Sequence, residues 1–325
     1  MNRFFEQLNE LGKNRIPFFF LTDFELEKPL VFTDENQMKQ AGVYYDFPGH
    51  QFLPSPYLQE KKLIKIELNA QIPGFDIYRT KFSIVQRALL RGDSYLTNLT
   101  LKIPLQASPG LDEIFQIARA KYKILMQERF ISFSPETFIR IQDNRIHTYP
   151  MKGTSPVSTD PDGTKLLNNS KELHEHYTIV DLLRNDLAIK GRNVQVVRFR
   201  YLEKIRSHGK EIWQTSSEIV ADLPENWPAQ IGDILQSMLP AGSVSGAPKT
   251  RTLEIIRQAE VEPRGYYTGV AGYFDGKTLD TAVMIRFIEQ AGNQFYYRSG
   301  GGITHLSNAQ EEYNEIKNKI YVPIA

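Results

Sequence analysis

Apolar residues recur with helical spacing in seven separate stretches of the chain. Gly12 and Gly92 end the first two, and Pro248 lies near the first turn of the sixth, where its missing N–H costs least. The pattern therefore predicts seven amphipathic helices, over residues 1–13, 82–90, 111–122, 171–186, 231–238, 248–260 and 309–320.

Other stretches have the alternation or the short apolar runs of β-strands. The last three such stretches, separated by turns at Gly276 and Gly292, are expected to form an antiparallel meander. Residues 34–61 have no clear period and are expected to be loop. Because strands and helices are mixed without βαβ alternation, the predicted class is α+β. The predicted strands cover residues 17–24, 29–33, 62–68, 95–103, 129–133, 138–142, 144–149, 194–199, 212–220, 266–274, 281–288 and 294–299.

Composition narrows the classes of function. The chain has 325 residues, is 41% hydrophobic and 24% charged, and carries a net charge of +1. This describes a globular protein, and the near-neutral charge gives no support for nucleic-acid binding. The absence of cysteine excludes disulfides, thiolate metal sites and cysteine nucleophiles. The most apolar short run, residues 16–21, cannot span a bilayer, and no signal-peptide core is visible. We expect a cytoplasmic protein without membrane contacts.

Two predicted helices carry pairs of carboxylates on one face. Glu172 and Glu175 are three residues apart, and their face continues into apolar Ile179, which suggests that it turns inward. Glu312 and Glu315 form a similar pair on the last helix. Each pair could be a solvated acidic surface, but four inward carboxylates are ligands of the kind that Mg²⁺ prefers.

Three further features could bind anions or react. Residues 242–249 are a small-residue segment before a helix, and Gly300–Gly302 could let backbone N–H groups approach an anion. Arg286 ends an apolar strand and needs an anionic partner. Lys152 precedes Gly153; such a lysine is most often a surface residue, but a lowered pKa would make it a nucleophile.

Eight stretches, in unbroken order, resemble the chorismate-utilising enzyme family of anthranilate, aminodeoxychorismate, isochorismate and salicylate synthases. The resemblance implies two packed antiparallel β-sheets flanked by helices. It implies a catalytic region over residues 71–325 and a short N-terminal portion, residues 1–70, packing on the main sheet. The stretches are GDSYLTNLT (92–100), FSPETF (133–138), YPMKGT (149–154), KELHEHYTIVDLLRNDL (171–187), LPAGSVSGAPKTRTLEII (239–256), RGYYTGVAGYFD (264–275), DTAVMIR (280–286) and SGGGITHLSNAQEEYNEIKNK (299–319).

The resemblance also implies roles for residues of the site. Glu175 and Glu315 match the family's Mg²⁺ ligands, with Glu172 and Glu312 beside them. The glycines and a lysine would hold the ring carboxylate, a tyrosine and an arginine the enolpyruvyl carboxylate, and Ser245 stands where relatives usually have Thr. These implied substrate contacts are Ser245, Tyr267, Arg286, Gly300, Gly301, Gly302 and Lys319.

Lys152 distinguishes the branches of the family. Anthranilate and isochorismate synthases have Ala in this motif, whereas aminodeoxychorismate synthases have Lys. The resemblance thus implies amination of chorismate to 4-amino-4-deoxychorismate, for p-aminobenzoate and folate synthesis, through a covalent Lys152 adduct. Since the chain has no cysteine, we expect ammonia to come from a separate glutamine amidotransferase subunit.

Two other readings stay open at this point. One is another chorismate synthase, such as anthranilate synthase component I; Lys152 argues against it. Gln214 also stands where relatives often have His, which disfavours an activity that eliminates pyruvate. The other is a catalytically inactive chorismate-binding subunit, which the retained Lys152, Glu175, Arg286 and Glu315 disfavour.

Overall fold

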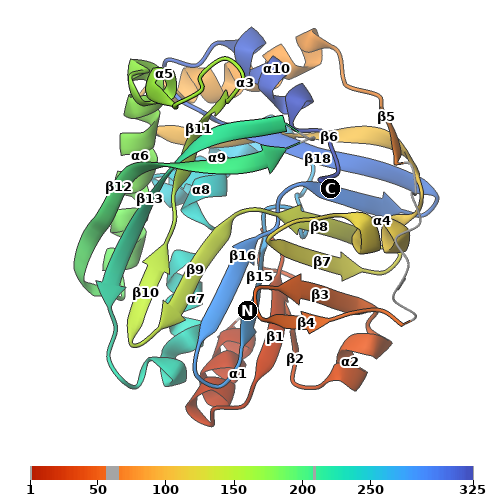
Figure 1. Ribbon diagram of the computed structural model, residues 1–325, viewed down its shortest axis with the longest axis vertical. Helices are drawn as coiled ribbons and strands as arrows, with labels where there is room; N and C mark the ends of the chain where they lie inside the picture. The colour runs from red at the N-terminus through yellow and green to blue at the C-terminus, as the bar shows by residue number, and fades with distance from the viewer. Residues whose placement is uncertain (1, 56–65, 208–209, 325) are drawn as a thin grey trace.

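The computed structural model describes residues 2–55, 66–207 and 210–324, and two antiparallel sheets dominate it (Figure 1). The first sheet has the order β11 (Met151–Pro156), β13 (Lys210–Asp222), β10 (Arg145–Thr148), β9 (Thr137–Gln142), β16 (Leu279–Val283), β15 (Val270–Phe274), β1 (Phe18–Thr22) and β2 (Leu30–Phe32), with β12 (Arg192–Ser207) paired to β13. The second has the order β14 (Gly246–Ala247), β6 (Leu96–Ser108), β18 (Gln294–Ile303), β17 (Phe287–Ala291), β8 (Phe130–Ser134), β7 (Tyr122–Met126), β3 (Val43–Phe47) and β4 (His50–Phe52), with β5 (Glu67–Ala70) paired to β6. The predicted α+β class and the two packed sheets are confirmed.

Helices cover the outer face of each sheet. Apolar residues of α1 (Asn2–Lys13), α6 (Ser170–Ala188) and α7 (Ile231–Met238) form one core with the first sheet. Those of α3 (Phe75–Leu90), α9 (Lys249–Glu260) and α10 (Ala309–Asn318) form another with the second sheet, joined by α4 (Leu111–Ile117). The smaller helical segments are α2 (Glu35–Gln40), α5 (Thr164–Leu167), η1 (Trp227–Gln230) and α8 (Gly242–Ser245).

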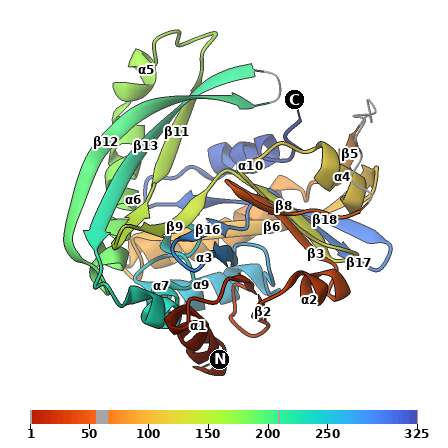
Figure 2. The same ribbon diagram turned by 60° about the horizontal axis from the view of Figure 1, so that its bottom comes forward.

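A third core lies between the sheets and is rich in aromatic rings. Phe19 of β1 stacks on Tyr45 of β3, with ring centroids 4.4 Å apart. The opposite end of the first sheet, formed by β11, β12 and β13, curves away from the second sheet (Figure 2). Residues of β9, β11, α6 and β18 line a pocket at this end of the molecule.

The N-terminal portion, residues 1–70, contributes strands to both sheets. Strands β1 and β2 pair within the first sheet, whereas β3 and β4 pair within the second. The prediction of loop over residues 34–61 is therefore wrong for its described part. Asp34 caps α2 by accepting from the Gln37 amide at 3.0 Å. Four of the five residues of β3 are buried, which removes the polar alternation that marks a half-buried strand.

Two other predicted elements end elsewhere. The helix over residues 111–122 stops at Ile117, because Tyr122 begins β7, whose five residues are all buried. The strand over residues 281–288 is two strands in different sheets, so the predicted meander does not form. The chain crosses between the sheets at Arg286, whose φ is 52°. The predicted strand over residues 62–68 begins at Glu67, and its residues 62–65 lie outside the described part.

Among the described residues, no helix is both long enough and apolar enough to cross a lipid bilayer.

Candidate active site

Lys152 lies at an irregularity in the outermost part of the first sheet. In the pairing of β11 with β13, Met151 is opposite Ser216 and Thr154 is opposite Gln214. Lys152 and Gly153 therefore face a single residue, which defines a β-bulge. Gly153 has a φ of +87°, a conformation that glycine adopts readily. The Lys152 amine extends from this bulge to α6 and lies 2.8 Å from a Glu175 carboxylate oxygen.

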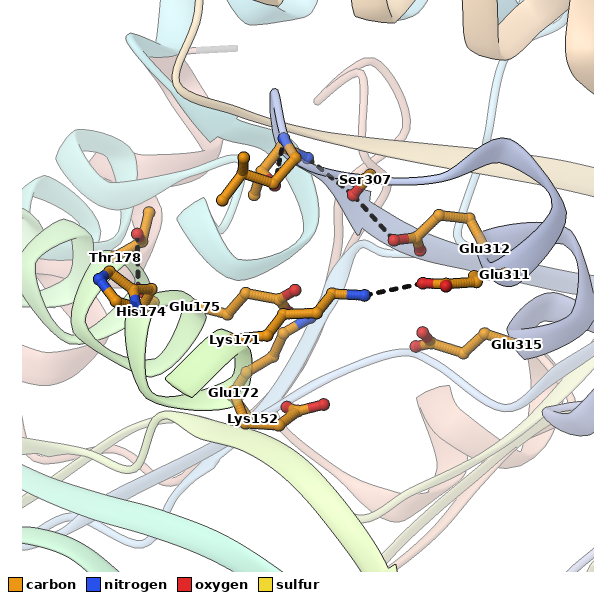
Figure 3. A network of polar contacts seen from close by, with 12 residues as sticks. Lys152, Lys171, Glu172, His174, Glu175, Thr178, Ser307, Glu311, Glu312 and Glu315 are labelled. Carbon is orange, nitrogen blue, oxygen red and sulfur yellow. Dashed lines mark hydrogen bonds and ion pairs between the residues drawn. The ribbon is translucent and has the colours of Figure 1, made fainter. Parts of the chain in front are cut away.

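The acidic pairs of α6 and α10 face one another, as their inward orientation predicts. Figure 3 shows Glu172 and Glu175 pointing from α6 toward Glu312 and Glu315 of α10. Asn169 caps the first turn of α6 through the Glu172 amide at 3.1 Å, which fixes where this acidic turn begins. The two helices thus bring four carboxylates to one side of the pocket.

Hydrogen bonds and charges set different proton affinities for these carboxylates. Burial and the nearby Glu175 charge raise the pKa of Glu172. Burial also raises the pKa of Glu312, although it accepts from the Ser307 hydroxyl at 2.8 Å. Burial acts in the same direction on Glu315, but the Lys319 and Lys152 amines outweigh it and hold that pKa below its ordinary value. Glu315 is therefore easier to ionise than Glu172 and Glu312.

The surroundings shift the pKa values of Lys152 and Lys319 in opposite directions. Burial acts to lower the pKa of Lys152, but Glu175 and Glu315 outweigh it and the pKa is raised. Burial lowers the pKa of Lys319, even though its amine lies 2.6 Å from Glu315. Lys152 is thus held as an ammonium by its acidic neighbours, whereas Lys319 carries its charge at a greater cost.

The glycine run extends the predicted strand over residues 294–299 to Ile303. Gly300, Gly301 and Gly302 lie in β18 and pair with β6. The Lys319 amine donates to the Gly300 carbonyl at 2.9 Å. A Cβ at Gly301 would lie 3.5 Å from a Glu312 oxygen and 3.7 Å from the Lys319 amine. The missing side chain therefore leaves this strand open toward the acidic cluster.

Arg286 lies on the same side of the molecule with unused hydrogen-bonding capacity. Its Nε is buried and has no hydrogen-bond partner among the described residues. Its guanidinium lies over the Tyr321 ring, 5.3 Å from the centroid. Nearby Tyr267 is buried, which raises its pKa to about 12 and keeps its hydroxyl protonated at neutral pH. The pair offers donors to an anion.

Ser245 lies on α8 and is fully buried, and its hydroxyl donates to the Ala241 carbonyl at 2.9 Å. It is outside the residues that line the pocket, and its role as a substrate contact stays a prediction. Ser243, two residues earlier on α8, lines the pocket instead. The spacing of the small residues does not indicate which hydroxyl of this short helix faces the pocket.

The sequence analysis missed Glu136, which follows β8. Its carboxylate lines the same pocket as Lys152 and accepts from the Ser243 hydroxyl at 2.6 Å. Burial raises its pKa, although the Ser243 hydroxyl and the Arg286 charge act in the opposite direction. A lone carboxylate between two apolar strands, within FSPETF (133–138), is the signal that could have drawn attention to it.

The four glutamates fit a magnesium ion by donor type. Among the described residues, no three acidic or histidine side chains are gathered into a ready metal-binding group. Mg²⁺ needs no closed protein cage, because it commonly takes one or two carboxylates and completes its shell with water and substrate oxygens. Glu175 lines the pocket and the carboxylates of α10 face it, so these hard oxygen donors suit such an ion.

Comparison with known proteins identifies the family. The model of the chorismate binding enzyme family matches residues 14–325. The chain belongs to the chorismate-utilising enzymes.

Individual relatives point to more than one branch of this enzyme family. An uncharacterized PabA-like protein of Haemophilus influenzae is 49% identical over the whole chain and 97% of its own length. Aminodeoxychorismate synthase component 1 of Salmonella typhimurium is 36% identical over 75% of this chain, which spans only 56% of that relative. The structure of anthranilate synthase component I from Streptococcus pneumoniae superposes with a TM-score of 0.65, at 25% identity, over 82% of this chain and 62% of that one. Family membership makes this protein an enzyme that acts on chorismate, and its product must be argued from the site.

Proposed function

We propose that this enzyme is a cytoplasmic aminodeoxychorismate synthase component that converts chorismate and ammonia to 4-amino-4-deoxychorismate. The observation that carries the proposal is the Lys152 amine in the pocket, 2.8 Å from Glu175. A nucleophile at this position permits a covalent route that a chain with alanine there lacks. The product would supply p-aminobenzoate and folate synthesis.

The proposed reaction has two balanced substitutions. Lys152, which Glu175 and Glu315 hold as an ammonium, first loses its extra proton to water. The neutral amine then forms a bond to ring carbon 2, the ring double bond shifts, and the bond from carbon 4 to its hydroxyl breaks. The hydroxyl leaves as water with a proton from an acid of the pocket, and the proton that the amine gives up restores that acid. Ammonia then bonds to carbon 4, the double bond shifts back, and the bond to Lys152 breaks as its nitrogen regains a proton. Two allylic steps replace one difficult displacement.

Glu136 is the group best suited to carry protons in these steps. It shares the pocket with Lys152, and burial raises its pKa, which favours its protonated form. Its hydrogen bond from Ser243 fixes the carboxylate orientation. In the first substitution Glu136 would give a proton to the leaving hydroxyl and regain one from the Lys152 amine. In the second it would give a proton to the leaving Lys152 nitrogen and accept the one that ammonia must lose.

Cations of the site would orient the two carboxylates of chorismate. Arg286 and Tyr267 would bind the enolpyruvyl carboxylate, and Lys319 with the strand of Gly300–Gly302 the ring carboxylate. Glu175 and Glu315 would hold Mg²⁺, with Glu172 and Glu312 beside it or on its waters. The ion supplies positive charge to the ring carboxylate. Fixing both ends of the substrate places its ring near Lys152.

The chain would depend on a partner for ammonia. It contains no cysteine, the nucleophile of the usual glutaminases. The name of the relative, aminodeoxychorismate synthase component 1, supports a partner subunit, which we propose to be a glutamine amidotransferase. Free ammonium should replace that subunit in vitro.

The decisive test is product identity. The isolated chain is incubated with chorismate, Mg²⁺ and either ammonium or glutamine, and the product is identified by mass. We expect aminodeoxychorismate with ammonium, no turnover with glutamine, and no turnover by Lys152→Ala with either. Fluorescent anthranilate together with pyruvate would instead assign the chain to the anthranilate branch. Turnover with glutamine alone would contradict the need for a partner.

A further inference from the structure

The bulge in β11 leaves the backbone of Lys152 outside the regular strand ladder. Met151 and Thr154 keep their partners on β13, and the two residues between them face Thr215 alone. A buried carbonyl without a partner would cost about 1–3 kcal/mol. The Thr215 hydroxyl donates to the Lys152 carbonyl and removes that cost. Thr215 is itself fully buried, so no bulk water competes for either group.

The direction of the Lys152 side chain depends on this bulge. Side chains of a strand alternate between the two faces of a sheet, and a one-residue slip exchanges the faces. The extra residue at Lys152–Gly153 is the feature that sets which face Lys152 occupies. Glu172 packs closely against the bulge from α6. A Cβ on Gly153 would lie only 2.8 Å from a Glu172 oxygen, so there is no room for a side chain at that residue.

Glu175, the ion-pair partner of Lys152, is also held in place through β13. His176, next to Glu175 on α6, lies 2.7 Å from the Ser217 hydroxyl of β13, and the Ser217 oxygen also accepts from the Arg200 amide at 2.8 Å. Thr215 and Ser217 are two residues apart on β13. One strand therefore holds both the backbone of Lys152 and the turn of α6 that carries Glu175.

We propose that Thr215 is a positioning residue, whose hydroxyl holds the bulge in the register that aims the Lys152 amine into the pocket. This inference rests on the proposed function, in which Lys152 is the nucleophile. The Thr215 hydroxyl donates to the backbone of Lys152 and has no part in the bonds that form or break. Valine has the shape of threonine without the hydroxyl, so it removes this hydrogen bond and keeps the pairing of residue 215 with Leu202 of β12.

The test compares Thr215→Val with Thr215→Ser in the ammonium-dependent reaction. We expect Thr215→Val to lower kcat by about 10-fold to 100-fold, as misplacement of a reacting group does, while KM for chorismate changes less than about threefold. Thr215→Ser should restore most of kcat. The matched control is Thr22→Val, which removes another buried hydroxyl that donates to a backbone carbonyl of the same sheet, at Val270. It should lower Tm without lowering kcat.

A second measurement does not depend on the product. Reductive methylation followed by peptide mass spectrometry reports the reactivity of individual lysines. The labelling rate of Lys152 should change by at least about threefold in Thr215→Val, because the amine then points elsewhere and meets the reagent differently. Lys319 in the same sample should be unchanged. Wild-type kcat and labelling in Thr215→Val, or equal losses in Thr215→Ser or Thr22→Val, would overturn the inference. A different wild-type product would refute the proposed function and leave the labelling test intact.

Discussion

Two buried arginines show how the structure separates stability from binding. Arg264 is 1% exposed, and all three of its guanidinium nitrogens donate. Nε and Nη2 contact the Glu260 carboxylate at 2.8 and 2.7 Å, while Nη1 and Nη2 also reach the carbonyls of Val244 and Asn98. Arg286, in contrast, keeps a buried Nε without a partner among the described residues.

The difference teaches which cation is available to a ligand. Arg264 joins α9 to α8 and β6, and each of its guanidinium nitrogens donates a hydrogen bond within the fold. Arg286 lies among tyrosines, and its retained donor costs stability unless an anion uses it. Burial alone would not distinguish the two residues; the count of satisfied donors does.

The largest expected effect is on the satisfied arginine. Arg264→Met should lower the free energy of unfolding by about 3–5 kcal/mol, because it leaves the Glu260 charge buried and unpaired. Denaturant titration measures this loss. The double variant Arg264→Met with Glu260→Gln should recover part of it. Equal stability of Arg264→Met and the wild type would remove the basis of the comparison.

The second effect is on the arginine with a free donor. Arg286→Lys keeps the charge but loses the forked geometry. Transition-state stabilisation should therefore weaken by about 2–3 kcal/mol, which lowers kcat/KM for chorismate roughly 30-fold to 150-fold. Its free energy of unfolding should change by less than about 1 kcal/mol, since no protein partner of Nε is lost. A loss of stability as large as that of Arg264→Met would show that Arg286 is also a structural residue.

The smallest effect concerns an exposed ion pair across the site. The Lys171 amine of α6 lies 3.0 Å from Glu311 of α10, and both side chains are well exposed (Figure 3). Lys171→Ala should change the free energy of unfolding by less than about 0.5 kcal/mol, and added salt should remove the difference. A loss above about 1 kcal/mol in high salt would mean that this pair holds the two helices together.

Local periodicity predicted the parts of the site that depend on a single helix. The spacing of Glu172 and Glu175, with apolar Ile179 beyond, indicated an inward acidic face, and the structure turns that face toward α10. The position of Lys152 depends instead on its register against β13, which is a long-range pairing that the sequence of β11 does not contain. Its importance came from the family resemblance and not from its own pattern.

Other features escaped prediction for related reasons. The predicted strand ended at residue 299, but β6 supplies a partner along the glycines at 300–302 and extends the strand through them. Glu136 stands alone in its segment, and only the approach of Ser243 from α8 reveals its place in the pocket. In each case the deciding neighbour is distant in sequence.

The most direct measurement of the central claim is the intact mass of the enzyme after rapid mixing with chorismate and Mg²⁺ without ammonium. The account predicts a fraction of protein heavier by one chorismate less one water, with the added mass on the peptide that contains Lys152, and its disappearance when ammonium is added. Lys152→Arg should show no such species. Full turnover by Lys152→Arg, or wild-type turnover with no adduct at any time, would contradict covalent catalysis by this lysine.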